Sequence, residues 1–113
     1  MLLKESEIHD VHGITVEQKQ RIMDFLQGAV SCWCKNREDE WFAARDLLGG
    51  ANYHWQGTPM IALWHAYNEN IKTAGQAAGR LLKQVLHEDE SRYFDSKKEA
   101  MTTKYIWKKD GAQ

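Results

Sequence analysis

The sequence predicts a mainly α-helical domain that ends in a small β-hairpin. Apolar residues recur at helical spacing through much of residues 16–88, and aromatic and β-branched residues flank a polar, lysine-containing segment near the carboxyl end. A chain of 113 residues suits one hydrophobic core. We therefore expect an amino-terminal arm over 1–14, a single domain over 15–109 and a short tail over 110–113.

Composition excludes several classes of protein. Hydrophobic residues make up 42% and charged residues 27% of the chain, which is typical of a globular domain and not of a disordered one. Two cysteines are too few for a disulfide scaffold and favour the reducing cytoplasm. No apolar run approaches the ~20 residues that cross a bilayer, and charge follows the first two leucines, unlike a signal peptide. We expect a soluble, cytoplasmic domain without membrane contact.

Charge is unevenly distributed, although the net charge is −1. Residues 1–78 hold seven Lys and Arg against ten Asp and Glu, whereas residues 79–113 hold eight against six. The carboxyl-terminal third is therefore the part that we expect to face an anionic partner.

The first helix is predicted from Thr15 to about Cys34. Thr15 and Gln18 have capping-box spacing, and an apolar stripe runs from Val16 to Trp33. Before this helix, we expect the ends of the arm to fray while a few of its apolar residues dock on the core.

Short elements follow the first helix. Trp41-Phe42 is predicted to be extended, and a short helix over 43–48 to end at Gly49-Gly50. Residues 51–57 form an aromatic loop. Thr58-Pro59 favours a new helix start, because threonine caps the first turn and proline has a suitable φ.

A helix over 74–88 is predicted to have one apolar and one basic face. Thr73, with Gln76 three residues later, indicates a capped start. Its apolar side is expected to pack on the core, and the other side carries Gln76, Arg80, Lys83 and His87 as one stripe. After it, aromatic residues bracket a polar, turn-like stretch over 95–103, which predicts a hairpin with Lys97 and Lys98 near its tip.

The order of elements over 58–107 resembles winged helix-turn-helix domains. The resemblance rests on the helix capped by Thr58, a turn around 70–73, the basic helix with Arg80-Leu81-Leu82-Lys83-Gln84, and the hairpin. The run Trp55-Gln56-Gly57-Thr58-Pro59 leading into Leu63 is also similar to winged domains at the ends of phage and plasmid replication proteins. The extra helix and loop within 49–69 lengthen the middle beyond a minimal winged helix.

This resemblance implies a non-catalytic module that binds double-stranded DNA, as a transcriptional regulator or a replication accessory of a mobile element. The helix near 74–88 would lie in the major groove and the hairpin near 92–107 at the backbone or minor groove. Arg80 suits guanine, Gln76 or Gln84 suits adenine, and Lys83 suits phosphate. Further phosphate contacts are expected from Lys72, the helix end near Thr73, Lys97, Lys98 and Lys104.

A second hypothesis is a winged-helix protein-interaction domain. The loop over 51–57 supplies aromatic anchors, Tyr53 and Trp55, with His54 between them. Acidic runs at 38–40 and 88–90 would complement a basic partner, and the second run would repel phosphate next to the reading helix. A homodimer remains open under either hypothesis.

Neither a metal site nor an enzyme is predicted. His9 with His12 and Cys32 with Cys34 have the residue types of a zinc site, but Cys-x-Cys on a helix points its sulfurs about 200° apart. Cys32 is expected to be half-buried and Cys34 to fray with the helix end, both as thiols. The chain has no Gly-x-Ser-x-Gly, phosphate-binding glycine loop or His-Glu-x-x-His motif, so no catalytic residue or cofactor is expected.

Overall fold

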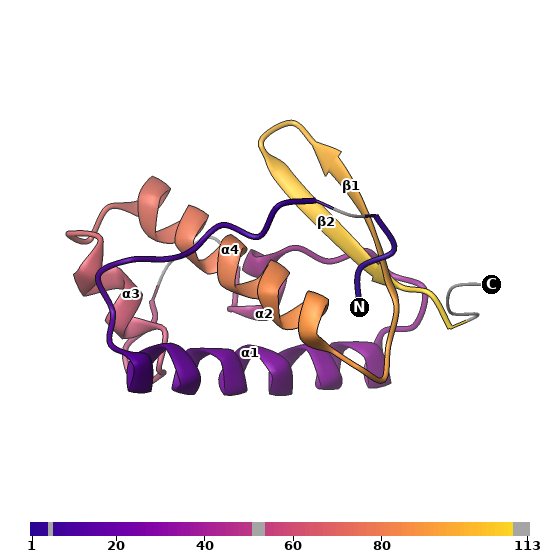
Figure 1. Ribbon diagram of the computed structural model, residues 1–113, viewed down its shortest axis with the longest axis horizontal. Coiled ribbons are helices and arrows are strands. Elements are labelled where there is room, and N and C mark those ends of the chain that lie inside the picture. The colour runs from indigo at the N-terminus through magenta and orange to yellow at the C-terminus, as the bar shows by residue number, and fades with distance from the viewer. Residues whose placement is uncertain (5, 51–53, 110–113) are drawn as a thin grey trace.

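The computed structural model describes residues 1–4, 6–50 and 54–109, and within them it has four helices followed by an antiparallel hairpin (Figure 1). The prediction of a mainly helical domain with a carboxyl-terminal hairpin is confirmed. The predicted tail, 110–113, lies outside the described residues. The elements are α1 (Val16–Asn36), α2 (Ala44–Leu47), α3 (Ile61–Ala66), α4 (Ile71–Glu88), β1 (Phe94–Glu99) and β2 (Thr102–Trp107).

α1 begins where the capping pattern predicts, and it ends two residues after the predicted end at Cys34. The Thr15 side chain accepts from the Gln18 backbone N–H, and the Gln18 side chain accepts from the Thr15 N–H. The helix continues to Asn36 because Cys34 is part of the core, where it is 2% exposed. The expectation that Cys34 frays and Cys32 is half-buried is therefore wrong: Cys32 is the exposed thiol.

The hydrophobic core lies where α1, α3, α4 and the base of the hairpin meet. In Figure 1, α4 crosses above α1, and the hairpin rises beyond α4. The predicted apolar face of α4 is confirmed, since seven of its residues are buried. Fully buried side chains from these elements, with Phe42 before α2 and Met60 before α3, fill the centre: Ile22, Leu26, Val30, Phe42, Met60, Leu63, Leu81, Leu82, Leu86 and Phe94.

The hairpin is longer in its strands and tighter in its turn than the sequence predicts. Residues 95–99 and 102–103 belong to strands, and the turn is formed by Ala100, which has a φ of 53°, and Met101. The register of β1 against β2 pairs Lys97 with Lys104, and Lys98 with Thr103. Because strand side chains alternate between faces, these two pairs lie on opposite faces of the hairpin.

Single residues extend both edges of this sheet. Phe42 pairs antiparallel with Tyr105, each backbone N–H donating to the other residue's carbonyl over 2.8 Å, which confirms the extended Trp41-Phe42 piece. On the other edge, Leu2 forms a parallel bridge with Phe94 and the Leu3 N–H donates to the Phe94 carbonyl. The expectation that the start of the arm frays is therefore wrong.

α4 begins three residues before the predicted position. Asn70 is its N-cap, and the Asn70 side chain accepts from the Thr73 backbone N–H over 3.0 Å. Asn68 and Glu69 have positive φ angles of 57° and 58°, which reverse the chain between α3 and α4. Thr73 is thus inside the first turn and not its cap.

Candidate anion-binding surface

An open concave surface, with a volume of about 710 Å³, is lined by residues of α2, α4, the hairpin and the arm. We call it the concave surface. Trp55 and Tyr105, both buried, form part of its floor. Its cationic lining residues come from three different elements: Arg45 from α2; Lys72, Arg80 and Lys83 from α4; and Lys98 from β1. No Asp or Glu is among the described residues that line it.

The α4 side of the concave surface is a stripe of basic, polar and small residues. Lys72, Gln76, Arg80 and Lys83 recur at spacings of three and four, so they share one side of the helix. Gly79 lies between them, and a Cβ built there would meet no atom within 4 Å. The helix backbone is therefore open to close approach at this point.

The hairpin side contributes Lys98 but not its strand neighbour. Lys98, Met101, Thr102 and Thr103 line the concave surface. Lys97 points away, and its ammonium lies 4.4 Å from the centroid of the Trp41 ring.

The structure therefore separates the three hairpin lysines that the sequence grouped together. Lys104, the register partner of Lys97, is also outside the lining and pairs with Glu99 at 3.3 Å. Of the three, Lys98 alone shares the concave surface with Arg80.

Among the residues that the structure describes, most Lys and Arg side chains outside the concave surface form ion pairs with carboxylates, whereas those that line it do not. Ion pairs hold seven cations in the described residues, and none of the seven lines the concave surface: Lys4, Lys19, Arg37, Arg92, Lys97, Lys104 and Lys109.

By contrast, Lys72, Arg80 and Lys98 make no ion pair or side-chain hydrogen bond within the part of the chain that the structure describes. Arg45 and Lys83 donate to neutral oxygens: the Thr102 hydroxyl at 2.9 Å and the Glu7 carbonyl at 2.7 Å. Like charges gathered without counter-charges attract an external anion.

Besides Lys97 and Lys104, two further predicted site residues, Gln84 and Thr73, are not brought to the concave surface. Gln84 donates to the Glu88 carboxylate over 2.8 Å and does not line it. Thr73 is also outside the lining, and its backbone N–H is bound by Asn70, so the phosphate contact expected there loses that donor.

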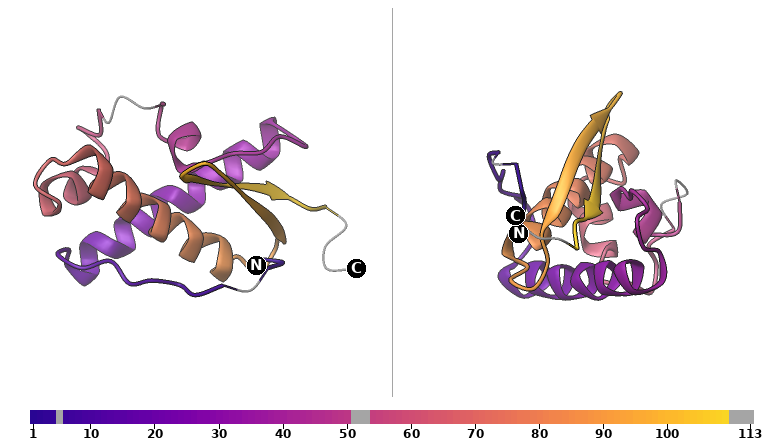
Figure 2. Two further views of the ribbon diagram at one scale, coloured as in Figure 1. Left: turned by 90° about the horizontal axis from the view of Figure 1, so that it is seen from above. Right: turned by 90° about the vertical axis from the view of Figure 1, so that its right-hand side faces the viewer.

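Among the lining residues with basic side chains, sequence reasoning missed two, Arg45 and His9. Arg45 lies on a four-residue helix without amphipathic periodicity, so no local pattern marks it. His9 belongs to the arm, which runs beside α4 in both Figure 1 and Figure 2 (left). Both positions follow from contacts between segments distant in sequence.

Trp55, one of the two aromatic anchors of the protein-interaction hypothesis, is buried in the structure. Trp55 is 3% exposed, and its ring meets that of Trp64 edge-on, with centroids 6.3 Å apart. His54 is exposed, and Tyr53 lies outside the described residues. As a member of the hydrophobic core, Trp55 is not available to insert into a partner while that core is intact.

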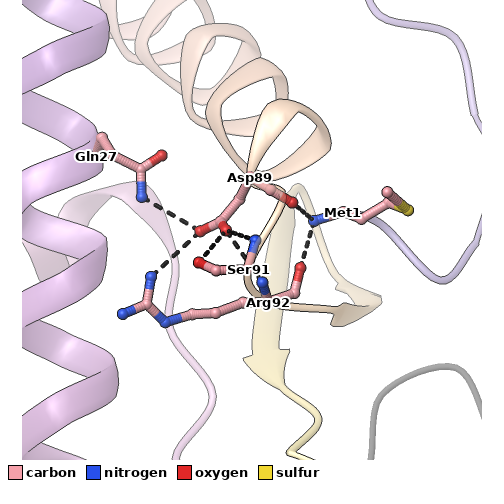
Figure 3. A network of polar contacts seen from close by, with 5 residues as sticks. All are labelled: Met1, Gln27, Asp89, Ser91 and Arg92. Carbon is pink, nitrogen blue, oxygen red and sulfur yellow. Dashed lines mark hydrogen bonds and ion pairs between the residues drawn. The ribbon is translucent and has the colours of Figure 1, made fainter.

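The acidic run at 88–90 is not a uniform surface, because Asp89 is buried. Figure 3 shows the polar contacts that Asp89 makes. Its carboxylate accepts from the backbone N–H and hydroxyl of Ser91, from the Arg92 backbone and guanidinium, and from the Gln27 amide, over 2.9–3.3 Å. Burial alone would raise the pKa of Asp89, but the Ser91 and Gln27 hydrogen bonds and the Arg92 charge outweigh it and lower that pKa. Asp89 therefore ties the end of α4 to α1.

Comparison with known proteins gives no match to a family model, to a curated protein or to a solved structure. Within the described residues, no helix has the length and apolar character needed to cross a membrane. No three His, Cys, Asp or Glu side chains in the same residues gather as metal ligands. The concave surface is therefore the feature of the molecule that bears most directly on function.

Proposed function

We propose that the chain is a winged helix-turn-helix module that binds double-stranded DNA without catalysis, with α4 as the reading helix and the hairpin as the wing. The order of elements supports this fold: a long helix, an extended Phe42 on the sheet edge, short helices, a basic helix and a hairpin. Such a module would serve transcriptional regulation or the replication of a mobile element.

The observation that carries the proposal is the concave surface, where five Lys and Arg from α2, α4 and β1 meet and the described lining has no carboxylate. Duplex DNA presents one negative charge per ~1.7 Å of its axis. A helix and a hairpin that both contribute cations to one concavity can contact phosphates on two sides of a groove.

Within this proposal, Arg80 and Gln76 are the base-reading residues. Both are exposed on the side of α4 opposite its buried face, which holds the helix against the core. Arginine pairs in a bidentate manner with guanine, and glutamine with adenine. Lys72, Lys83 and Lys98 are phosphate-binding residues, with Lys83 exchanging the Glu7 carbonyl for phosphate.

Titration of labelled duplexes at several salt concentrations tests the proposal. We expect log K to fall linearly with log salt, with a slope of about −0.9 for each phosphate neutralised. Arg80→Ala should lose both affinity and preference among duplex sequences. Arg21→Ala is the matched control, because Arg21 is also an exposed helical arginine but lies outside the concave surface.

Two outcomes would contradict the proposal. One is the absence of duplex binding at low salt and micromolar protein. The other is equal loss of affinity in the Arg80 and Arg21 variants, which would show that binding follows net charge and not the concave surface.

A further inference from the structure

We propose that Arg45 is both a phosphate-binding residue of the concave surface and the residue that sets the angle of the hairpin over α4. This inference rests on the proposed function and extends it to α2, an element to which the sequence assigns no role. It follows from where Arg45 lies, what its guanidinium binds, and how the chain before it is held.

The backbone before Arg45 is fixed to the middle of β2. Phe42 exchanges both backbone hydrogen bonds with Tyr105. Ala43, which is buried, donates its backbone N–H to the Asp46 carboxylate over 2.8 Å and so closes the turn that starts α2. Arg45 therefore extends from a backbone whose position relative to the hairpin is already determined.

The guanidinium of Arg45 reaches the first residue of β2, next to the turn of the hairpin. Its Nη2 donates to the Thr102 hydroxyl over 2.9 Å, a contact between residues 57 positions apart. On the outer face, Lys97 lies over the Trp41 ring. Segment 41–45 thus holds the hairpin at three points: a ring on one face, a backbone pair in the centre and a guanidinium near the tip.

A single bond to Thr102 leaves most of the guanidinium available. Arginine has five N–H donors in a fixed fork, and within the described residues the bond to Thr102 is the one side-chain hydrogen bond of Arg45. Arg45 also lines the concave surface with Arg80 and Lys98. One part of the fork can therefore hold the hairpin while another part binds phosphate, which a lysine ammonium at the end of a flexible chain cannot do in the same geometry.

Three variants separate the two roles. Arg45→Ala removes both, and we expect a roughly tenfold or greater loss of duplex affinity and a salt slope smaller by about one. Thr102→Val keeps the shape and the arginine charge, so affinity should fall by less while the slope stays that of the unmodified protein. Arg45→Lys keeps the positive charge but loses the fork that holds Thr102. Its salt slope should therefore equal that of the unmodified protein, and its duplex affinity should equal that of Thr102→Val.

The measurement is duplex titration at four or more salt concentrations, with circular dichroism melting of each variant. Arg45 is exposed, so these variants should retain the fold. The inference is overturned if Arg45→Ala keeps the full salt slope while Lys98→Ala, which removes a phosphate-binding lysine of the same surface, loses about one unit. It is also overturned, together with the proposed function, if the unmodified protein binds no duplex. A slope reduced equally in Thr102→Val would show that Arg45 acts through the hairpin and not on phosphate.

Discussion

Lys97 and Lys98 are adjacent in β1, but their side chains lie on opposite faces of the hairpin. Lys98 lines the concave surface with Arg80, whereas Lys97 lies over the Trp41 ring and 3.9 Å from the Glu99 carboxylate. The strand alternation that separates them also separates the consequences of removing each one.

We predict that Lys98→Ala weakens duplex binding and reduces the salt slope by about one, whereas Lys97→Ala leaves the slope unchanged. Loss of the cation–π contact should lower the free energy of unfolding of Lys97→Ala by about 0.5–1 kcal/mol. Salt-dependent titration and urea unfolding measure the two effects. Equal slopes in the two variants would show that both faces of the hairpin contact DNA.

Gly79 allows stability and binding to be tested separately. Gly79→Ala should raise the free energy of unfolding by about 0.5–1 kcal/mol, because glycine in a helix costs conformational entropy and a Cβ here meets no neighbour. Gly79→Leu should keep the fold but fill the concave surface, and we expect a roughly tenfold loss of duplex affinity.

Gly28 in α1 is the matched control, since a Cβ there also meets nothing within 4 Å and it lies outside the concave surface. Gly28→Leu should bind duplex as the unmodified protein does. If Gly79→Leu also binds normally, DNA does not approach α4 at this turn.

The buried carboxylate of Asp89 should make the free energy of unfolding depend on pH in the acid range. Its pKa in the folded protein is below the ordinary value of 3.8, because the hydrogen bonds of Ser91 and Gln27 and the Arg92 charge overcome the cost of burial. Folding therefore favours the carboxylate, so this contribution is complete above pH 3.8 and is lost as pH falls through the lowered pKa.

Asp89→Asn should lower the free energy of unfolding at neutral pH by about 1.5–3 kcal/mol and weaken its dependence on pH below 3.8. Glu90→Gln, at an exposed neighbouring position, should leave the free energy of unfolding at neutral pH unchanged. Chemical unfolding between pH 2.5 and 7 measures both effects, the range being roughly that over which a carboxylate titrates. An unchanged Asp89→Asn profile would exclude this network as a source of stability.

The two cysteines should differ in reactivity. Cys32 is exposed, whereas Cys34 is buried and burial raises the pKa of its thiol. A thiol reagent should modify one cysteine quickly and the second only when the protein unfolds. Cys32→Ser should remove the fast phase. A fast phase that persists in Cys32→Ser would contradict the burial of Cys34.

Local patterns predicted much of the helical part of the fold. The capping box at Thr15, the apolar face of α4 and the existence of the hairpin follow from short-range sequence signals, and all three are confirmed. The start of α4 was misplaced because Thr73 and Asn70 both suit a cap, and the positive φ angles before Asn70 decide between them.

Features that depend on distant contacts were not predictable in this way. The pairing of Leu2 with Phe94 and the contact of Arg45 with Thr102 join segments far apart in sequence. Lys97 and Lys98 lie on opposite faces because β1 continues to Glu99, whereas the polar composition of 95–103 predicts a turn-like stretch there. For this reason the sequence named Lys97 and Lys98 together and gave Arg45 no role.

The most direct test of the concave surface is to map duplex binding onto it. Backbone amide chemical shifts, recorded while a short duplex is titrated into labelled protein, report the contact surface residue by residue. We predict that the largest changes occur along α4 from Lys72 to Lys83, at Arg45 and from Lys98 to Thr103. Changes centred on α1 and the outer hairpin face around Trp41, or no changes at all, would contradict the account.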